Sequence, residues 1–166
     1  KRIQGFQARY GPLVALDIPE AVDQRRGAMF ATSDLRKLAA ILTYSDVMVT
    51  VFSTLMLEAC LFDLPVVNVG FWRYRDTELS NRLYKEFTHI KRIMDYKATP
   101  MAANEQELID LIDAYLKDRS VHRQGRLLIK EREAGPNKGH AGRAIAEHLL
   151  RLADSNDVLV GGGGGS

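Results

Sequence analysis

Two hydroxyls and a carboxylate lie close together where an apolar run of the sequence leads into a helix. Ser53 and Thr54 follow the β-branched run Asp46–Val51, and a short apolar helix is expected over Thr54–Asp63. Hydroxyls and the unpaired N–H groups of a helix start are the donors that phosphate oxygens need. Glu58 follows Thr54 by about one helical turn. Its carboxylate is therefore placed to accept hydrogen bonds from the two hydroxyls of a ribose, while the start of the helix binds a pyrophosphate.

The same three residues have a simpler interpretation. Ser53 or Thr54 would act as an ordinary helix cap, and Glu58 would be an incidental charge on the flank of the helix. Against this, Glu58 is surrounded by apolar residues between Leu55 and Phe62, and a carboxylate is seldom left in such surroundings without a partner. The spacing alone leaves both interpretations open.

Two further candidates lie downstream. Arg73, in the aromatic and basic segment Phe71–Asp76, would neutralise a diphosphate or an anionic acceptor, with a neighbouring aromatic ring stacked on a base or sugar. The alternative is a cationic surface loop. His89 precedes two basic residues and would donate to a phosphate or sugar hydroxyl as charge develops on a leaving group. The alternative is a surface histidine near a helix end.

Other motifs are assigned to structure rather than to chemistry. Gly135–Arg143 lacks the order of residues of a phosphate loop and follows no expected strand, so it predicts a helix stop followed by a helix start. Cys60 lies mid-helix in an apolar run and is not expected to be a nucleophile. The remaining histidines are His122, His140 and His148. They have no metal-ligand spacing with Cys60 or with one another, so no metal site is expected.

The elements that must position these residues alternate short apolar runs with amphipathic helices. Asp46–Val51 is expected to be a strand buried on both faces, and Asn104 with Glu107 predicts a capping box. Strand, helix and strand in succession predict an α/β fold, a Rossmann-like parallel sheet with helices on both faces. In such sheets ligands bind beyond the carboxyl ends of the strands. The expected strands are Leu13–Ile18, Asp46–Val51, Pro65–Phe71 and Thr99–Ala103, and the expected helices are Ser33–Leu42, Thr54–Asp63, Asp76–Lys97, Asn104–Leu116, Asp118–Glu133 and Ala141–Leu152.

Length and composition are those of an ordinary globular domain. The chain has 166 residues, of which 46% are hydrophobic and 27% charged, which suffices for one buried core and excludes disordered, collagen-like and coiled-coil classes. A net charge of +2 gives no electrostatic case for binding nucleic acid. The single cysteine indicates a reducing compartment, and neither a membrane span nor a signal peptide is expected. The glycine-rich end is typical of an engineered linker, so the domain is expected over 1–154 and a tail over 155–166.

The run Asp46–Phe71, DVMVTVFSTLMLEACLFDLPVVNVGF, resembles the donor-nucleotide half of GT-B glycosyltransferases. The bacterial surface-polysaccharide transferases and the related UDP-N-acetylglucosamine 2-epimerase fold are most similar in pattern. In those families a buried strand leads into a Ser/Thr- or Gly-containing turn, a helix carrying Glu and a proline-led strand. The downstream segment His89–Asp118 and the closing pair of helices fit the same pattern, so the resemblance covers about Leu13–Leu152. The glycines common in the family's phosphate turn are replaced here by Phe52-Ser53-Thr54.

The resemblance implies a truncated C-terminal domain of a GT-B enzyme. In it Ser53 and Thr54 would meet the donor's phosphates, Glu58 its ribose and His89 its phosphate or sugar, with Arg73 added from its residue chemistry. The parent enzyme would transfer a sugar or sugar-like group from a nucleoside-diphosphate sugar to a glycan or lipid-linked acceptor. No separate cofactor is implied. Because the catalytic base of such enzymes usually comes from the other domain, the fragment alone is expected to be inactive.

Two alternatives remain beside this interpretation, a fragment of a sugar-nucleotide 2-epimerase and a non-catalytic protein-interaction module. The first strands of a complete donor domain and the whole acceptor domain have no counterpart in the sequence. The expected partners are therefore the nucleotide-sugar donor, the missing acceptor domain and, through an exposed sheet edge, a second chain. The expected location is the cytoplasm, including the inner face of the membrane.

Overall fold

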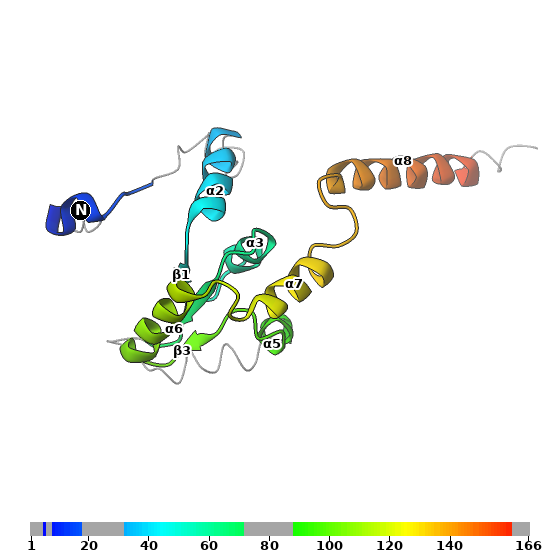
Figure 1. Ribbon diagram of the computed structural model, residues 1–166. Coiled ribbons are helices and arrows are strands. Elements are labelled where there is room, and N and C mark those ends of the chain that lie inside the picture. The colour runs from blue at the N-terminus through cyan, green and yellow to red at the C-terminus, as the bar shows by residue number, and fades with distance from the viewer. Residues whose placement is uncertain (1–4, 6–7, 18–31, 72–87, 161–166) are drawn as a thin grey trace, which may run out of the picture. The chain divides into compact units, whose positions relative to one another are not determined.

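The computed structural model describes residues 5, 8–17, 32–71 and 88–160 (Figure 1). The chain divides into two compact units, Lys1–Ser45 and Asp46–Ser166, and each is described by itself. The first unit contains the 3-10 helix η1 (Gly11–Leu13) and helix α2 (Thr32–Tyr44). The second contains, in chain order, β1 (Met48–Thr50), α3 (Leu55–Leu61), β2 (Val66–Val69), α5 (Thr88–Asp95), β3 (Met101–Ala102), α6 (Glu105–Lys117), α7 (Arg123–Arg132) and α8 (Ala141–Val160).

The three strands of the second unit form an open parallel sheet in the order β1-β2-β3. Met48 of β1 lies opposite Val66 of β2, and Asn68 of β2 lies opposite Met101 of β3. Helix α3 lies in the connection between β1 and β2, as the crossover between parallel strands requires. The expected α/β class and parallel sheet are confirmed, and the arrangement is compatible with a Rossmann-like fold.

Helices cover both faces of this sheet, as expected. Successive side chains of a strand point to opposite faces, and two neighbours on β2 have different helical partners. Val67 belongs to a core cluster with Tyr115 of α6, whereas the Asn68 Nδ2 atom lies 3.8 Å from the Met56 Sδ atom of α3. Helices α6 and α3 therefore pack on opposite faces, and α7 in turn packs against α3 (Figure 1).

The start of α6 forms the capping box that the sequence predicts. The Asn104 side chain accepts a hydrogen bond from the Glu107 N–H at 2.9 Å, and the Glu107 carboxylate accepts one from the Ala103 N–H at 2.8 Å. The Glu107 N–H, which the helix itself leaves unpaired, is thereby satisfied, and the returning bond from Glu107 holds the N–H of Ala103 rather than that of the N-cap residue Asn104. The predicted helix stop at Gly135–Arg143 is also confirmed, because α7 ends at Arg132 and α8 begins at Ala141.

The strand expected at Leu13–Ile18 is wrong over the residues that the structure describes. Gly11–Leu13 is a 3-10 helix, residues 14–17 have no regular structure, and Leu13 is 89% exposed. A strand is stabilised by hydrogen bonds to a neighbouring strand. Among the described residues of the first unit there is no second strand with which this segment could pair.

The strand after Asp46 is present, but its expected burial on both faces is wrong. Val49 of β1 is 47% exposed, and Val51 just beyond the strand is 51% exposed. The reason is the position of β1 at the edge of the described sheet, whereas α6 packs on β2 and β3. The face of β1 that points to the α6 side is therefore covered only in part.

The boundaries of two helices also differ from expectation. The helix expected from Asp118 begins only at Arg123, because His122 before it has the left-handed backbone conformation with a φ of 57°. Helix α8 continues beyond Leu152 to Val160. Within the described part of the chain, no helix is long and apolar enough to cross a membrane.

Candidate functional site

The turn between β1 and α3 lies at the edge of the sheet where the parallel strands end. Thr54 is the N-cap residue of α3, but its side chain makes no capping hydrogen bond. The first contacts of the helix are made by backbone alone, with the Met56 N–H donating to the Ser53 carbonyl at 3.2 Å and the Leu57 N–H to the Thr54 carbonyl at 2.9 Å. Neither hydroxyl is hydrogen-bonded to another described residue. The side-chain capping that the simpler interpretation requires is therefore not observed.

Glu58 lies on the same side of α3 as Thr54. The Glu58 N–H donates to the Thr54 carbonyl at 3.4 Å, so the two residues are one helical turn apart. Both are exposed, and Phe62, one further turn along, is 43% exposed. The Glu58 carboxylate makes no ion pair with any residue in the described ranges.

The apolar surroundings expected for Glu58 are wrong. The apolar residues of α3 that pack inward are Met56, Ala59 and Cys60, each at most 1% exposed. Residues three and four apart share a face of a helix, so the stripe from Thr54 through Glu58 to Phe62 faces away from that packed side. The Glu58 carboxylate is therefore available to bind a ligand. Because it is exposed to solvent, it does not need a partner to offset the cost of burial.

The other predicted site residues do not enter this geometry. Arg73 lies outside the described residues, as does all of the segment Phe71–Asp76 except Phe71. His89 lies in α5, and its side chain is likewise outside the description. Of the predicted set, the structure places Thr54 and Glu58 on one exposed side of α3, and half-buried Ser53 directly before Thr54 in the turn that follows β1.

The opposite end of α3 carries a charged cluster that the sequence reasoning missed. The Asp63 carboxylate accepts hydrogen bonds from the Nε atoms of Arg123 at 2.7 Å and of Arg126 at 2.9 Å. The Arg126 side chain is 1% exposed and also donates to the carbonyls of Arg119 and Val121. This cluster ties the end of α3 to α7 and to the connection that precedes it.

The surroundings of Asp63 favour its ionised form. Burial opposes ionisation of the carboxyl, but the hydrogen bonds from Arg123 and Arg126 outweigh burial and lower its pKa. One feature of the sequence could have signalled the cluster: Gly125-Arg126 opens an otherwise apolar stretch of α7, and a glycine permits close packing there. The partner, 63 residues earlier, has no such signal.

Cys60 has the properties of a core side chain. It is 1% exposed, and burial raises the pKa of its thiol to about 12. A thiol of this kind is a poor nucleophile, because the thiolate is the reactive form. No group of three or more potential metal ligands occurs among the described residues.

The second unit is therefore an α/β domain with an open three-stranded parallel sheet. At the edge where the strands end, the Ser53 and Thr54 hydroxyls lie in a turn and make no capping hydrogen bond. Comparisons with protein-family models, with curated proteins and with solved structures found no match.

Proposed function

We propose that the second unit is the donor-binding part of a glycosyltransferase, and that the stripe from Ser53 to Glu58 binds a nucleoside diphosphate. The proposal is supported chiefly by the turn after β1. Its hydroxyls take part in no capping hydrogen bond, and it lies at the edge where open parallel sheets bind ligands.

The chemistry of the stripe fits the two polar parts of such a ligand. The Ser53 and Thr54 hydroxyls, which make no capping hydrogen bond, would donate to the diphosphate oxygens. Glu58, one turn along the exposed side, would accept hydrogen bonds from the ribose hydroxyls. The sugar carried by the donor and the acceptor that receives it would meet residues beyond this stripe, and the catalytic base would come from another domain.

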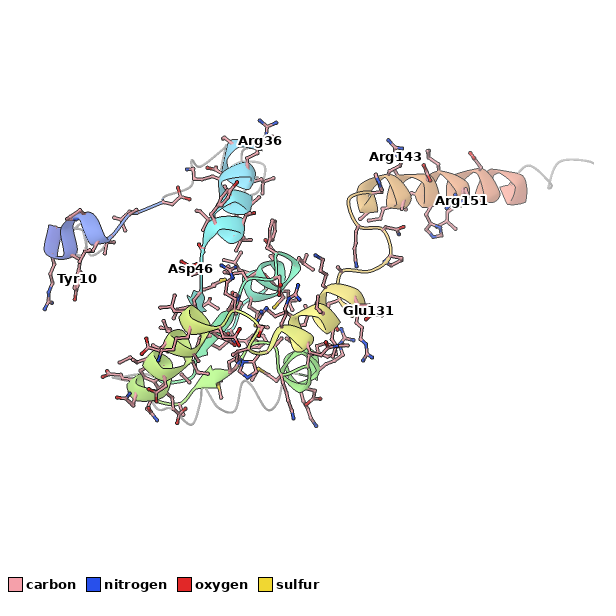
Figure 2. All side chains as sticks on the ribbon, in the orientation of Figure 1. Tyr10, Arg36, Asp46, Glu131, Arg143 and Arg151 are labelled. Carbon is pink, nitrogen blue, oxygen red and sulfur yellow. The ribbon has the colours of Figure 1, made fainter. Side chains whose placement is uncertain are left out.

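Calorimetry with UDP, CDP and GDP tests the proposal on the full chain. We expect at least one nucleotide to bind, and Glu58→Gln to weaken that binding by about 1–3 kcal/mol, the range for hydrogen bonds to a charged partner. Glu131→Gln is the matched control, because Glu131 is exposed and belongs to α7 rather than to the turn or to α3 (Figure 2). Unchanged affinity in Glu58→Gln would remove the assignment of the ribose partner.

A non-catalytic interaction module is the second candidate, and one observation favours it. Helix α8 exposes an apolar stripe in which Ile145 is 61%, Leu149 59% and Leu152 49% exposed. These residues are spaced three and four apart, so they share one face of the helix. An absence of binding with all three nucleotides, in a chain shown to be folded by circular dichroism, would favour this candidate over the donor domain.

A further inference from the structure

A half-buried histidine lies at the end of the connection between α6 and α7. The His122 Nδ1 atom lies 2.8 Å from the Tyr115 hydroxyl oxygen, and the two rings meet edge to face with centroids 5.7 Å apart. Tyr115 is fully buried in the core cluster beneath α6. His122 itself immediately precedes α7 and has the left-handed backbone conformation, with a φ of 57°. The pair therefore joins the first residue before α7 directly to the core.

The 2.8 Å separation fits either direction of this hydrogen bond, because a hydroxyl both donates and accepts. Burial is the main cause that raises the pKa of Tyr115, so the phenol keeps its proton and can donate it to the ring. Neutral imidazole has one nitrogen that accepts. We assign that role to Nδ1 and place the ring proton on Nε2, and in this form both atoms that face each other are satisfied.

Protonation of His122 removes the acceptor. A proton on Nδ1 turns this atom into a donor that faces the Tyr115 hydroxyl, and the buried phenol proton then has no acceptor on the ring. A buried polar group that loses its partner destabilises the folded state. The added positive charge would also lie near the guanidinium of Arg126, which is 1% exposed. Both effects favour release of the ring from the core.

The charged and titratable groups around the ring come from each element packed there. Arg126 belongs to α7, Tyr115 to α6, and Cys60 and Asp63 to the end of α3. Asp63 does not neutralise a charged His122, because its carboxylate is already engaged by Arg126 and Arg123. The remaining charged groups of the connection are Asp118, whose carboxylate accepts from the Ser120 N–H, and Arg119, which pairs with Asp46.

We propose that the His122–Tyr115 pair is a pH-sensitive latch, in which protonation of His122 releases the α6–α7 connection and loosens α7 from the core. The same connection is held by Arg126, which donates to the Val121 carbonyl at 2.7 Å and to the Arg119 carbonyl. Release of His122 therefore exposes those hydrogen bonds to water as well. The latch does not depend on what the Ser53–Thr54 turn binds.

The sign of the pH effect follows from the environment of the ring. Burial, and after it the charge of Arg126, lower the pKa of His122. The open state is therefore protonated before the closed one. The His122–Tyr115 pair contributes its full stabilisation of the closed state above the ordinary histidine pKa of about 6.5. This stabilisation is lost as the pH falls below that value. At pH 5.5 the open state should therefore be favoured relative to neutral pH, and the ordinary histidine value limits the effect to at most about tenfold.

Two measurements on the full chain test the latch. Amide hydrogen exchange in α7, corrected for the intrinsic effect of pH, should accelerate between pH 7.5 and 5.5 by at most about tenfold. His122→Asn should abolish this response, since asparagine tolerates the left-handed conformation and does not titrate in this range. His148→Asn, at an exposed position of α8, should retain it. An equal response in His122→Asn and in the wild type would overturn the proposal.

An NMR titration of the wild-type histidines covers the case in which His122→Asn fails to fold. The imidazole of His122 should titrate below the ordinary histidine value of about 6.5, since burial lowers its pKa. In the neutral form its nitrogen shifts should show the proton on Nε2. Titration of His122 at or above the ordinary value, or a proton on Nδ1 at pH 7.5, would refute the latch.

Discussion

Replacement of Asp63 by asparagine tests the charged cluster that joins α3 to α7. Asp63 has the left-handed backbone conformation with a φ of 55°, which asparagine tolerates better than most residues. The substitution keeps an oxygen that can accept from the Arg126 Nε atom and removes only the negative charge. The fold should therefore remain intact while the guanidinium of Arg126, 1% exposed, loses its counter-charge.

The size of the effect follows from the burial of the partners. Breaking a buried ion pair by removing one partner costs about 3–5 kcal/mol. The Asp63 side chain is 33% exposed and asparagine still accepts a hydrogen bond, so we expect a loss of about 2–3 kcal/mol in the free energy of unfolding, near the value for a charged hydrogen bond. Arg123 pairs with the same carboxylate but is 55% exposed, so Arg123→Gln should cost less than about 1 kcal/mol.

Urea unfolding followed by circular dichroism at pH 7 measures both variants. The pH dependence of the free energy of unfolding provides a second readout. Burial opposes ionisation of Asp63, but its hydrogen bonds lower its pKa in the folded protein. As the pH falls, Asp63 is therefore protonated in the unfolded chain before it is protonated in the folded one. The stabilisation is present above the unfolded value of about 3.9 and is lost as the pH falls below it. Asp63→Asn should flatten this loss. A cost for Asp63→Asn no larger than that for Arg123→Gln would refute the reasoning.

Two further predictions concern the packing around α7 and α3. A methyl group at Gly125 would collide with the Tyr96 carbonyl oxygen and lie 2.8 Å from the Ala98 Cα and N atoms, so Gly125→Ala should lower the free energy of unfolding by about 1–3 kcal/mol. Gly142→Ala, where a methyl group would meet nothing within 4 Å, is the control and should be neutral or stabilising in the same urea titration. Cys60, with its pKa raised to about 12 by burial, should react with a disulfide reagent at pH 8 only as fast as the protein opens. Labelling of the native protein at the rate of the urea-unfolded chain would contradict the burial of this thiol.

The elements with strong local signals were predicted well from the sequence. The Asn104–Glu107 capping box placed the start of α6, and the break at Gly135 placed the end of α7. The apolar run before Phe71 predicted β2, the central strand, because its residues are buried by neighbours on both sides. The Ser53–Thr54 turn was also found, since a strand followed at once by a helix leaves polar residues at the junction.

The predictions from sequence were wrong where a residue's environment depends on partners that are distant in the chain. The run Leu13–Ile18 has the composition of a strand, but a strand requires a second strand to pair with. Likewise, the exposure of Val49 follows from the edge position of β1, and the exposure of Glu58 from the side of α3 that packs inward. Periodicity in the sequence shows that a helix has an apolar face, but only packing shows which of its flanks remains open.

The sequence by itself determined the α/β class, the parallel sheet and the position of the Ser53–Thr54 turn. Each of these depends on short patterns of residues a few positions apart. Only the tertiary structure decided that Arg126 is buried against Asp63, 63 residues away, and that His122 interrupts the expected helix to reach Tyr115. A buried charge or hydrogen bond is formed by whichever partner the fold brings within about 3 Å. That choice depends on the packing of whole elements and leaves no periodic pattern in the sequence.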